Sequence, residues 1–202
     1  MPNFLKPEAF GLDISDRSLR IAELEKKKKD LRLVSFGEAK IPPGIIEEGK
    51  VKKIENLAEI IKKSLKEVKG KRIKTKYVIS SLPEEKSFLD VLQLPVLKEE
   101  EIEKAIRFQI ENYIPLNLEE VYFDFEKIHL VGGQKKYQEV LIAATPKKIV
   151  DPYLESLKQA GLRPLALEVE CLAIVRALIK KNSVTGPLLI IDFGETRTTF
   201  II

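Results

Sequence analysis

The sequence contains one cysteine, one histidine and no tryptophan among 202 residues. A single cysteine excludes an internal disulfide framework and is typical of a reducing compartment. This residue, Cys171, lies in an apolar helical stretch, so we expect a buried small side chain rather than a nucleophile. The single histidine, His129, argues against a Ser–His–Asp triad and against a histidine-based metal site.

Long apolar runs are also absent. No segment approaches the roughly 20 apolar residues that a membrane-spanning helix needs, and the N-terminal MPNFLKPEAF lacks the basic, apolar and small-residue order of a signal peptide. These absences predict a soluble, cytoplasmic protein. The length suits one or two domains with a substantial core, because a domain usually holds about 100–200 residues.

The net charge of +4 is spread along the chain, and lysines and glutamates interleave along most expected helices. Such patterning is typical of solvated helix faces. The exception is EKKKKD at 25–30, between two strand-like segments, which we interpret as a solvated hairpin tip. An anionic membrane or a nucleic acid could use such a tip, but no aromatic residue is interleaved and no phosphate-binding glycine lies nearby. Nucleic-acid binding is therefore not expected.

Apolar periodicity predicts an α/β chain. The expected strands are 8–14, 18–25, 31–41, 76–82, 87–95, 121–130, 137–145 and 163–170. The expected helices are 51–69, which Gly70 would end, 98–115, 147–160 and 170–181. Strand, helix, two strands and helix over about 84–162 are expected to form a compact unit. We expect this unit to be inserted into another unit, whose parts precede and follow it in the sequence.

Two stretches far apart repeat one pattern: GLDISDRSLRIAEL at 11–24 and LLIIDFGETRTTFII at 188–202. In each, an apolar strand ends in an aspartate, a turn with hydroxyl and charged groups follows, and a second strand begins. Turn amides and hydroxyls can bind phosphate oxygens, and an aspartate can hold Mg²⁺ through water. Two copies suggest two similar halves that face one another. Plain turn caps are the alternative, since surface hairpins commonly end in Asp and Ser.

This pattern resembles the two phosphate loops of the actin-like ATPase superfamily, which includes actin, heat-shock chaperones, sugar kinases and the division protein FtsA. More narrowly, the chain resembles the type IV pilus assembly ATPase family PilM. The matching stretches cover nearly the whole chain and occur in the same order as in the family. Beyond the first hairpin, the matching stretches are IPPGIIEEGKV, LQLPVLKEEEIEKAIRFQIENYIPLNLEEVYFDFE, EVLIAATPKKIVDPYLESLKQAGLRPLALEVE and IIDFGETRTT.

The resemblance implies an actin-like, ribonuclease H-like fold with named subdomains. Residues 1–83 plus 163–185 would form subdomain 1A, and 84–162 would form an inserted α+β subdomain 1C. Residues 187–202 would begin subdomain 2A, whose remainder, with 2B and the adenosine-binding loop, would be missing. We therefore interpret the chain as a fragment, because its last strands would otherwise expose pairing edges.

The resemblance also implies a nucleotide site for ATP and Mg²⁺, with Mg²⁺ held through water by Asp13 and Asp192. The implied nucleotide-binding residues are Asp13, Ser15, Asp16, Arg17, Ser18 and Arg20 in the first loop and Asp192, Gly194, Glu195, Thr196, Arg197 and Thr198 in the second. The first loop departs from the family, because Ser15 replaces a glycine and Asp16 adds a negative charge that Arg17 and Arg20 would offset. We expect ATP to bind weakly or not at all and hydrolysis to be weak at most. No catalytic residue is assigned, and Glu195 and Arg197 are expected to face solvent.

The function that the resemblance implies is a cytoplasmic scaffold of type IV pilus assembly. It would dock the N-terminal tail of a PilN-like inner-membrane partner in the groove between 1A and 1C and would reach the membrane only through that partner. The alternatives are an FtsA-like division protein, the cytoplasmic domain of the type II secretion protein GspL, and an actin-like ATPase or kinase. Self-association is left open.

Overall fold

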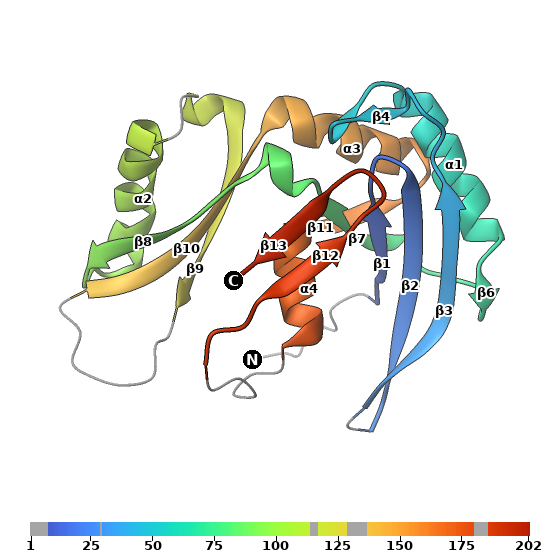
Figure 1. Cartoon of the computed structure of the whole chain (residues 1–202), viewed down its shortest axis with the longest axis horizontal. Helices are drawn as coiled ribbons and strands as arrows, with labels where there is room; N and C mark the ends of the chain where they lie inside the picture. The colour runs from blue at the N-terminus through green and yellow to red at the C-terminus, as the bar shows by residue number, and fades with distance from the viewer. Residues whose placement is uncertain (1–7, 29, 114–116, 129–136, 180–185) are drawn as a thin grey trace. The chain divides into compact units, whose positions relative to one another are not determined.

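The computed structural model describes residues 8–28, 30–113, 117–128, 137–179 and 186–202 (Figure 1). Its chain divides into two compact units, Met1–Glu84 with Pro152–Ile202 and Glu85–Asp151, called the first and the second unit below. His129, residues 131–136 between two of the expected strands, and residues 180–185 lie outside the described residues. No helix in the described ranges is long and apolar enough to cross a bilayer.

The first unit is built on a six-stranded sheet with the strand order β11-β7-β1-β2-β3-β6. Strands β1, β2 and β3 form an antiparallel meander, whereas β7 runs parallel to β1 and β11 parallel to β7. The strand bounds are β1 Phe10–Ile14, β2 Ser18–Lys27, β3 Asp30–Lys40, β6 Lys69–Gly70, β7 Tyr77–Leu82 and β11 Arg163–Val169. Alternating apolar residues of β1 and β2 are buried and form part of the core, as the period-two pattern predicts.

Two short hairpins complete the strands of the first unit. One joins β4 Ile46–Glu47 to β5 Lys50–Val51, and the other joins β12 Ile190–Phe193 to β13 Thr198–Ile201. The EKKKKD segment lies at the tip of the β2–β3 hairpin, where Lys27 pairs with Asp30, as expected.

Helix α1 (Ile54–Lys66) is amphipathic and buries Leu57, Ala58 and Ile61. It is shorter than the expected 51–69, because residues 50 and 51 pair within the β4–β5 hairpin. Gly70 does not end the helix: it lies in β6 opposite Ser35 with a φ of +91°. A Cβ atom at Gly70 would lie 2.2 Å from the carbonyl oxygen of Val34, so the close approach of β6 to β3 requires glycine.

The second unit packs helix α2 (Glu99–Tyr113) on a three-stranded antiparallel sheet with the order β8-β10-β9. The strand bounds are β8 Phe88–Pro95, β9 Val121–Ile128 and β10 Tyr137–Pro146, with 3₁₀ turns at Glu84–Lys86 and Leu118–Glu120. Ile102, Ile106 and Ile110 are fully buried and pack with apolar side chains of β8 and β10. The expected helical stripe is confirmed at these three positions.

Helix α3 (Lys147–Gln159) begins in the second unit and ends in the first. Its later residues belong to the first unit because they bond there: the hydroxyl of Tyr153 donates to the Gly49 carbonyl at 3.2 Å, and that of Ser156 donates to the Ile54 carbonyl at 3.4 Å. The second unit therefore ends at Asp151, within the range 84–162 expected for the inserted subdomain. Residues 187–202 belong to the first compact unit, and their place in a further subdomain stays a prediction.

Helix α4 (Glu170–Leu178) follows β11 directly, without a linking loop. Its second residue, Cys171, is buried as expected. Burial raises the pKa of the Cys171 thiol to about 11, so the thiol stays protonated at neutral pH.

Candidate functional site

The first candidate turn, between β1 and β2, is closed by two serines. The Ser15 N–H donates to the Ser18 carbonyl at 2.9 Å, and the Ser15 hydroxyl oxygen accepts a hydrogen bond from the Ser18 N–H at 3.2 Å. The two hydroxyl oxygens lie 2.9 Å apart. Among the described residues, Lys28 and Glu48 are the non-glycine residues with positive φ, so the backbone at Ser15 is one that any residue adopts. Serine therefore fits a place where the family has glycine.

The second candidate turn, between β12 and β13, repeats this closure. The Gly194 N–H donates to the Arg197 carbonyl at 2.8 Å. A Cβ atom at Gly194 would lie 3.0 Å from the Arg197 carbonyl oxygen, so a side chain here would press on the turn backbone.

The strand pairing around both turns has the same register. Asp13 pairs with Arg20 in the first hairpin, and Asp192 pairs with Thr199 in the second. The two hairpins therefore correspond residue by residue, with a constant difference in numbering. The corresponding pairs used below are Ser15 and Gly194, Asp16 and Glu195, and Leu19 and Thr198.

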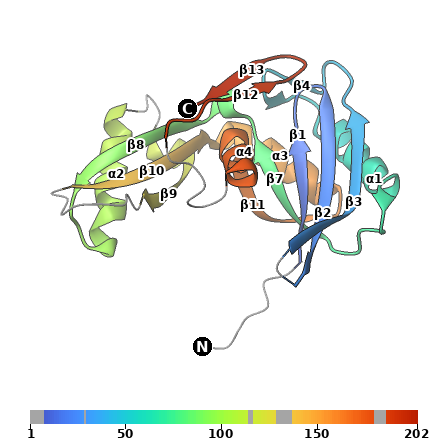
Figure 2. The same cartoon turned by 60° about the horizontal axis from the view of Figure 1, so that its bottom comes forward.

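Both hairpins line one cleft of about 620 Å³ within the first unit. The turn of β12–β13 lies beside the turn of β1–β2 in both views (Figures 1 and 2). The lining residues are Ser15, Arg17, Ser18, Arg20, Glu38, Ala39, Lys40, Glu170, Asp192, Phe193, Gly194, Glu195, Thr196, Arg197 and Thr199. The structure thus brings together nine of the twelve residues suggested by the sequence, and Asp13, Asp16 and Thr198 lie outside this lining.

Asp13 makes contacts through both oxygens of its carboxylate. Oδ1 accepts a hydrogen bond from the Ser81 hydroxyl at 2.9 Å, and Oδ2 lies 3.5 Å from Nη1 of Arg20. The same guanidinium donates through Nε to Glu38 at 3.2 Å. Arg20 therefore bridges two carboxylates beside the cleft.

Asp16 is buried, with 8% of its surface exposed. Its Oδ1 accepts a hydrogen bond from the Gly49 N–H at 2.9 Å and lies 3.5 Å from Nη2 of Arg197. The carboxylate of Asp16 is thus directed to the β4–β5 turn and to the second hairpin, where Arg197 lies beside its negative charge. Arg197, expected to face solvent, is half-buried by the same ion pair.

Glu170 is a cleft residue that the sequence analysis missed. It is the first residue of α4, and it lines the cleft together with Asp192. Burial raises the pKa of its carboxyl to about 7, with further contributions from Asp13, Asp192 and Glu84, while Arg20 acts in the opposite direction. A glutamate at the junction of an apolar strand and a helix is the sequence signal that could have identified it.

The side chains of the cleft fit an anion better than a directly bound metal ion. No group of three or more His, Cys, Asp or Glu side chains in the described ranges is arranged to hold a metal, and Arg20 already pairs with Asp13. In contrast, Nη1 of Arg17 is buried without a hydrogen-bond partner among the described residues. Together with the hydroxyl of Ser18, this guanidinium offers donors to phosphate oxygens.

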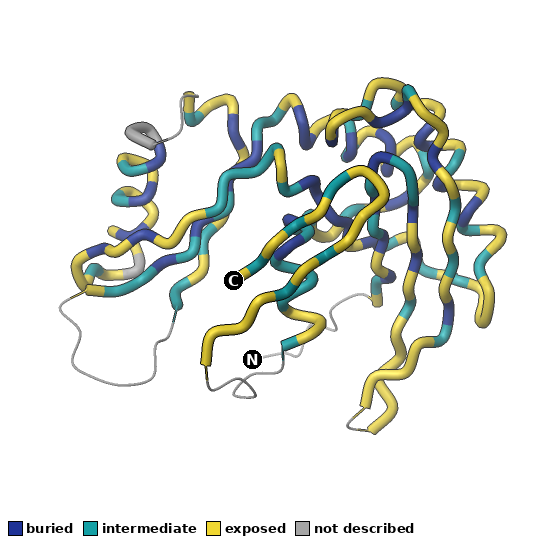
Figure 3. Tube along the Cα trace, viewed as in Figure 1, coloured by how far each residue is buried: buried dark blue, intermediate teal, exposed yellow. Residues whose placement is uncertain are grey.

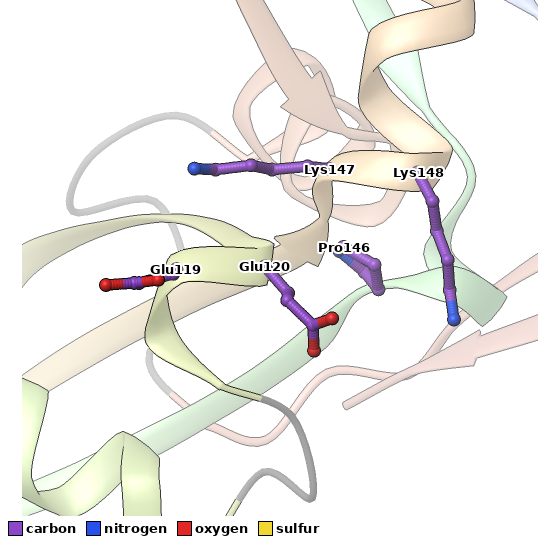
Figure 4. Close-up of a pocket in the computed structure, with 5 residues that line it drawn as sticks. All are labelled: Glu119, Glu120, Pro146, Lys147 and Lys148. Atoms are coloured by element: carbon purple, nitrogen blue, oxygen red, sulfur yellow. The ribbon is translucent and has the colours of Figure 1, made fainter.

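A second, smaller cavity of about 280 Å³ lies in the second unit. It is lined by Glu119, Glu120, Pro146, Lys147 and Lys148, and Glu120 and Lys148 extend on either side of Pro146 (Figure 4). The ammonium of Lys147 lies 5.3 Å from the centre of the Tyr122 ring. Its two lysines and two glutamates balance in charge, and none of these five residues has a buried donor without a partner, so this cavity carries no argument for an ionic ligand.

Comparison with known proteins identifies the family. The family model described as "Type IV pilus assembly protein PilM" matches residues 11–202. A solved chain of the "PilM-PilN type IV pilus biogenesis complex" is 30% identical, with a TM-score of 0.76 over 85% of this chain. The present chain spans 50% of the length of that chain.

A second solved structure is the cytoplasmic domain of EpsL, an inner-membrane component of the type II secretion system of Vibrio cholerae. It matches 96% of this chain and 71% of its own chain, with 12% identity and a TM-score of 0.54. At this identity the match shows a shared mixed α/β fold alone. The family match, by contrast, covers almost every residue, and the chain belongs to the type IV pilus assembly protein PilM family.

Proposed function

We propose that this chain is a cytoplasmic scaffold of type IV pilus assembly that docks a PilN-like inner-membrane protein. The observation that carries the proposal is the 30% identity and TM-score of 0.76 with a chain of the PilM–PilN complex. The family match over residues 11–202 supports the same assignment. The EpsL domain is described as part of an inner-membrane component, which agrees with a fold that serves secretion and pilus machines.

The proposed docking element is the short N-terminal tail of the partner. An extended tail binds by burying a few apolar side chains and by pairing its backbone groups with the receptor. In this arrangement the partner's own membrane anchor holds the chain at the inner membrane, so the chain needs no spanning helix.

The cleft between the two hairpins is the proposed nucleotide site. Its support is the shared turn geometry and the common lining by both turns. The hydroxyl of Ser18 would donate to phosphate oxygens, and Glu170 can hold or release a proton near pH 7 in the same cleft. We expect weak ATP binding and little hydrolysis, so that the cleft acts as a ligand site rather than as an efficient ATPase centre.

A peptide titration tests the scaffold proposal. A fluorescent peptide copied from the cytoplasmic N-terminus of the PilN-like partner would be titrated with the chain and followed by anisotropy. A scrambled peptide of the same composition is the control. We expect saturable binding that depends on the peptide sequence. Equal responses to both peptides, with circular dichroism showing a folded chain, would contradict docking.

A further inference from the structure

The first hairpin contains an arginine, Arg17, that lines the cleft and has one guanidinium nitrogen without a hydrogen-bond partner among the described residues. Nη1 of Arg17 is buried and makes no hydrogen bond to any described residue. The backbone of Arg17 is fixed, because its carbonyl accepts a hydrogen bond from the Ile41 N–H at 2.8 Å. Buried donors normally have acceptors, so an unpaired guanidinium N–H beside a cleft is available to an acceptor that is not part of the chain, and its positive charge favours an anion.

Asp13, the expected carboxylate for Mg²⁺, already carries a compensating charge. Ser81 bonds to one of its oxygens at 2.9 Å, and Arg20 lies 3.5 Å from the other. A hydrated Mg²⁺ at this carboxylate would have to displace Arg20 or lie beside its positive charge. The guanidinium therefore supplies positive charge beside Asp13, as a metal ion would.

The charged residues that line the cleft come from different elements. The first hairpin and the end of β3 contribute the cations Arg17, Arg20 and Lys40 and the carboxylate Glu38. The second hairpin and α4 contribute the carboxylates Glu170, Asp192 and Glu195 and the cation Arg197. Because Arg20 is already paired with Asp13 and Glu38, Arg17 and Lys40 are the cations of the first hairpin and β3 that a polyphosphate would meet.

We propose that the first hairpin binds the phosphate chain of a nucleotide, or an inorganic polyphosphate, without a divalent cation. Arg17 donates to the phosphate oxygens together with the hydroxyl of Ser18, Ser15 holds the turn closed, and Lys40 adds positive charge to the cleft. Arg20 replaces the metal ion as the partner of Asp13. This inference rests on the proposed nucleotide site and names the chemistry that the site selects.

Calorimetric titration of the 202-residue chain with tripolyphosphate tests the inference. The titration is run once in EDTA and once with excess Mg²⁺. We expect saturable binding in EDTA and no gain in affinity with Mg²⁺, because the metal would mask the phosphate charges that Arg17 recognises. Binding that requires Mg²⁺ would overturn the proposal.

Variants separate the role of Arg17 from general electrostatics. Arg17→Ala should weaken binding in EDTA about tenfold, the scale of a lost charge-assisted hydrogen bond, and Arg17→Lys should restore part of it. Lys26→Ala removes a cation on β2 far along the strand from the turn and should leave the affinity unchanged. Equal effects of Arg17→Ala and Lys26→Ala would refute a specific role for Arg17.

Arg20→Ala should change how binding depends on Mg²⁺, which a purely structural role of Arg20 would not affect. Removal of the guanidinium leaves Asp13 free to attract a cation, so binding in EDTA should weaken and Mg²⁺ should now strengthen it. An unchanged response to Mg²⁺ in this variant would contradict the replacement of metal by Arg20. Circular dichroism and thermal unfolding of each variant control for folding.

The partner peptide makes failure of the two proposals distinguishable. If the chain binds the peptide but not tripolyphosphate in either buffer, the inference fails and the scaffold stands. If it binds tripolyphosphate in EDTA but not the peptide, the inference stands and the docking function fails.

Discussion

The hairpins β1–β2 and β12–β13 have the same strand register and the same turn hydrogen bond, yet they lie in different surroundings. The first is part of the six-stranded sheet, and its inward residues Leu12 and Leu19 are buried. The second forms a separate two-stranded sheet, and Phe193 is 78% exposed. Figure 3 shows this contrast as buried positions along β1 and mostly exposed or intermediate positions along β12 and β13. The turn geometry therefore depends on local hydrogen bonds more than on burial of the strands.

The two turns also reach that geometry by different chemistry. Ser15 closes the first turn with its own hydroxyl, which bonds to Ser18. Gly194 closes the second by allowing the Arg197 carbonyl to approach where a side chain would lie. The comparison shows that glycine is needed only where the backbone approaches closely, and that a short polar side chain can otherwise take its place.

The largest expected difference between the hairpins concerns core burial. Leu19→Ala should lower the free energy of unfolding by about 2–5 kcal/mol, because Leu19 is fully buried and its truncation leaves a cavity. Thr198→Ala, at the corresponding exposed position, should change it by less than about 0.5 kcal/mol. Urea unfolding followed by circular dichroism measures both. Similar losses in the two variants would show that the second hairpin is buried in solution.

The next difference concerns the acidic residue in each turn. Asp16→Ala should lower the free energy of unfolding by about 1–3 kcal/mol, because it leaves the Gly49 N–H without this acceptor and removes the carboxylate beside Arg197. Glu195→Ala, at the corresponding exposed position, should have little effect. Asp16→Asn keeps an acceptor for Gly49 but removes the charge, and should fall between the two. The prediction fails if Glu195→Ala is as destabilising as Asp16→Ala.

The sequence alone predicted those elements whose residue pattern is complete within one continuous segment. The helix with Ile102, Ile106 and Ile110 was predicted because its period of apolar residues is complete within one element. The similarity of the two hairpins was visible because each repeats the same order of residue types.

Features that depend on distant partners were missed. The contact of Asp16 joins it to Gly49, 33 positions away, and the later half of α3 is assigned to the first unit by bonds such as Tyr153 to Gly49. Nothing near Asp16 or Tyr153 in the sequence marks these partners. The position of Glu170 between an apolar strand and a helix is visible in the sequence, but its raised pKa is not, since burial and the carboxylates of other elements set it.

A reciprocal exchange of the turn residues tests the difference between their chemistries. Ser15→Gly should lower the free energy of unfolding by about 1 kcal/mol, because it removes the hydroxyl bonds to Ser18 and increases the conformational entropy of the unfolded chain. Gly194→Ser should instead act locally and speed exchange of the residue 194 amide, since a Cβ atom would lie 3.0 Å from the Arg197 oxygen. Urea unfolding and amide hydrogen exchange distinguish the two effects. A stabilising Ser15→Gly would contradict the role given to the serine hydroxyl.

The smallest expected effect concerns Glu170, which lines the cleft between the hairpins. Its pKa rises from 4.5 to about 7 on folding, so the folded state binds this proton more tightly than the unfolded state. The resulting stabilisation is present in full below pH 4.5 and is lost as the pH rises through about 7.

Glu170→Gln has no proton to lose, so it should match the wild-type chain in stability near pH 4.5 and exceed it above pH 7. The gain should be at most about 1 kcal/mol, because solvent screens a partly exposed carboxylate. Thermal unfolding at the two pH values measures it, with Glu195→Gln as a control that removes an exposed charge from the same cleft. An equal gain at both pH values would show that Glu170 acts through packing rather than through its charge. The carboxylates of Glu170, Asp192 and Glu195 would then repel a phosphate in the cleft less than their number suggests.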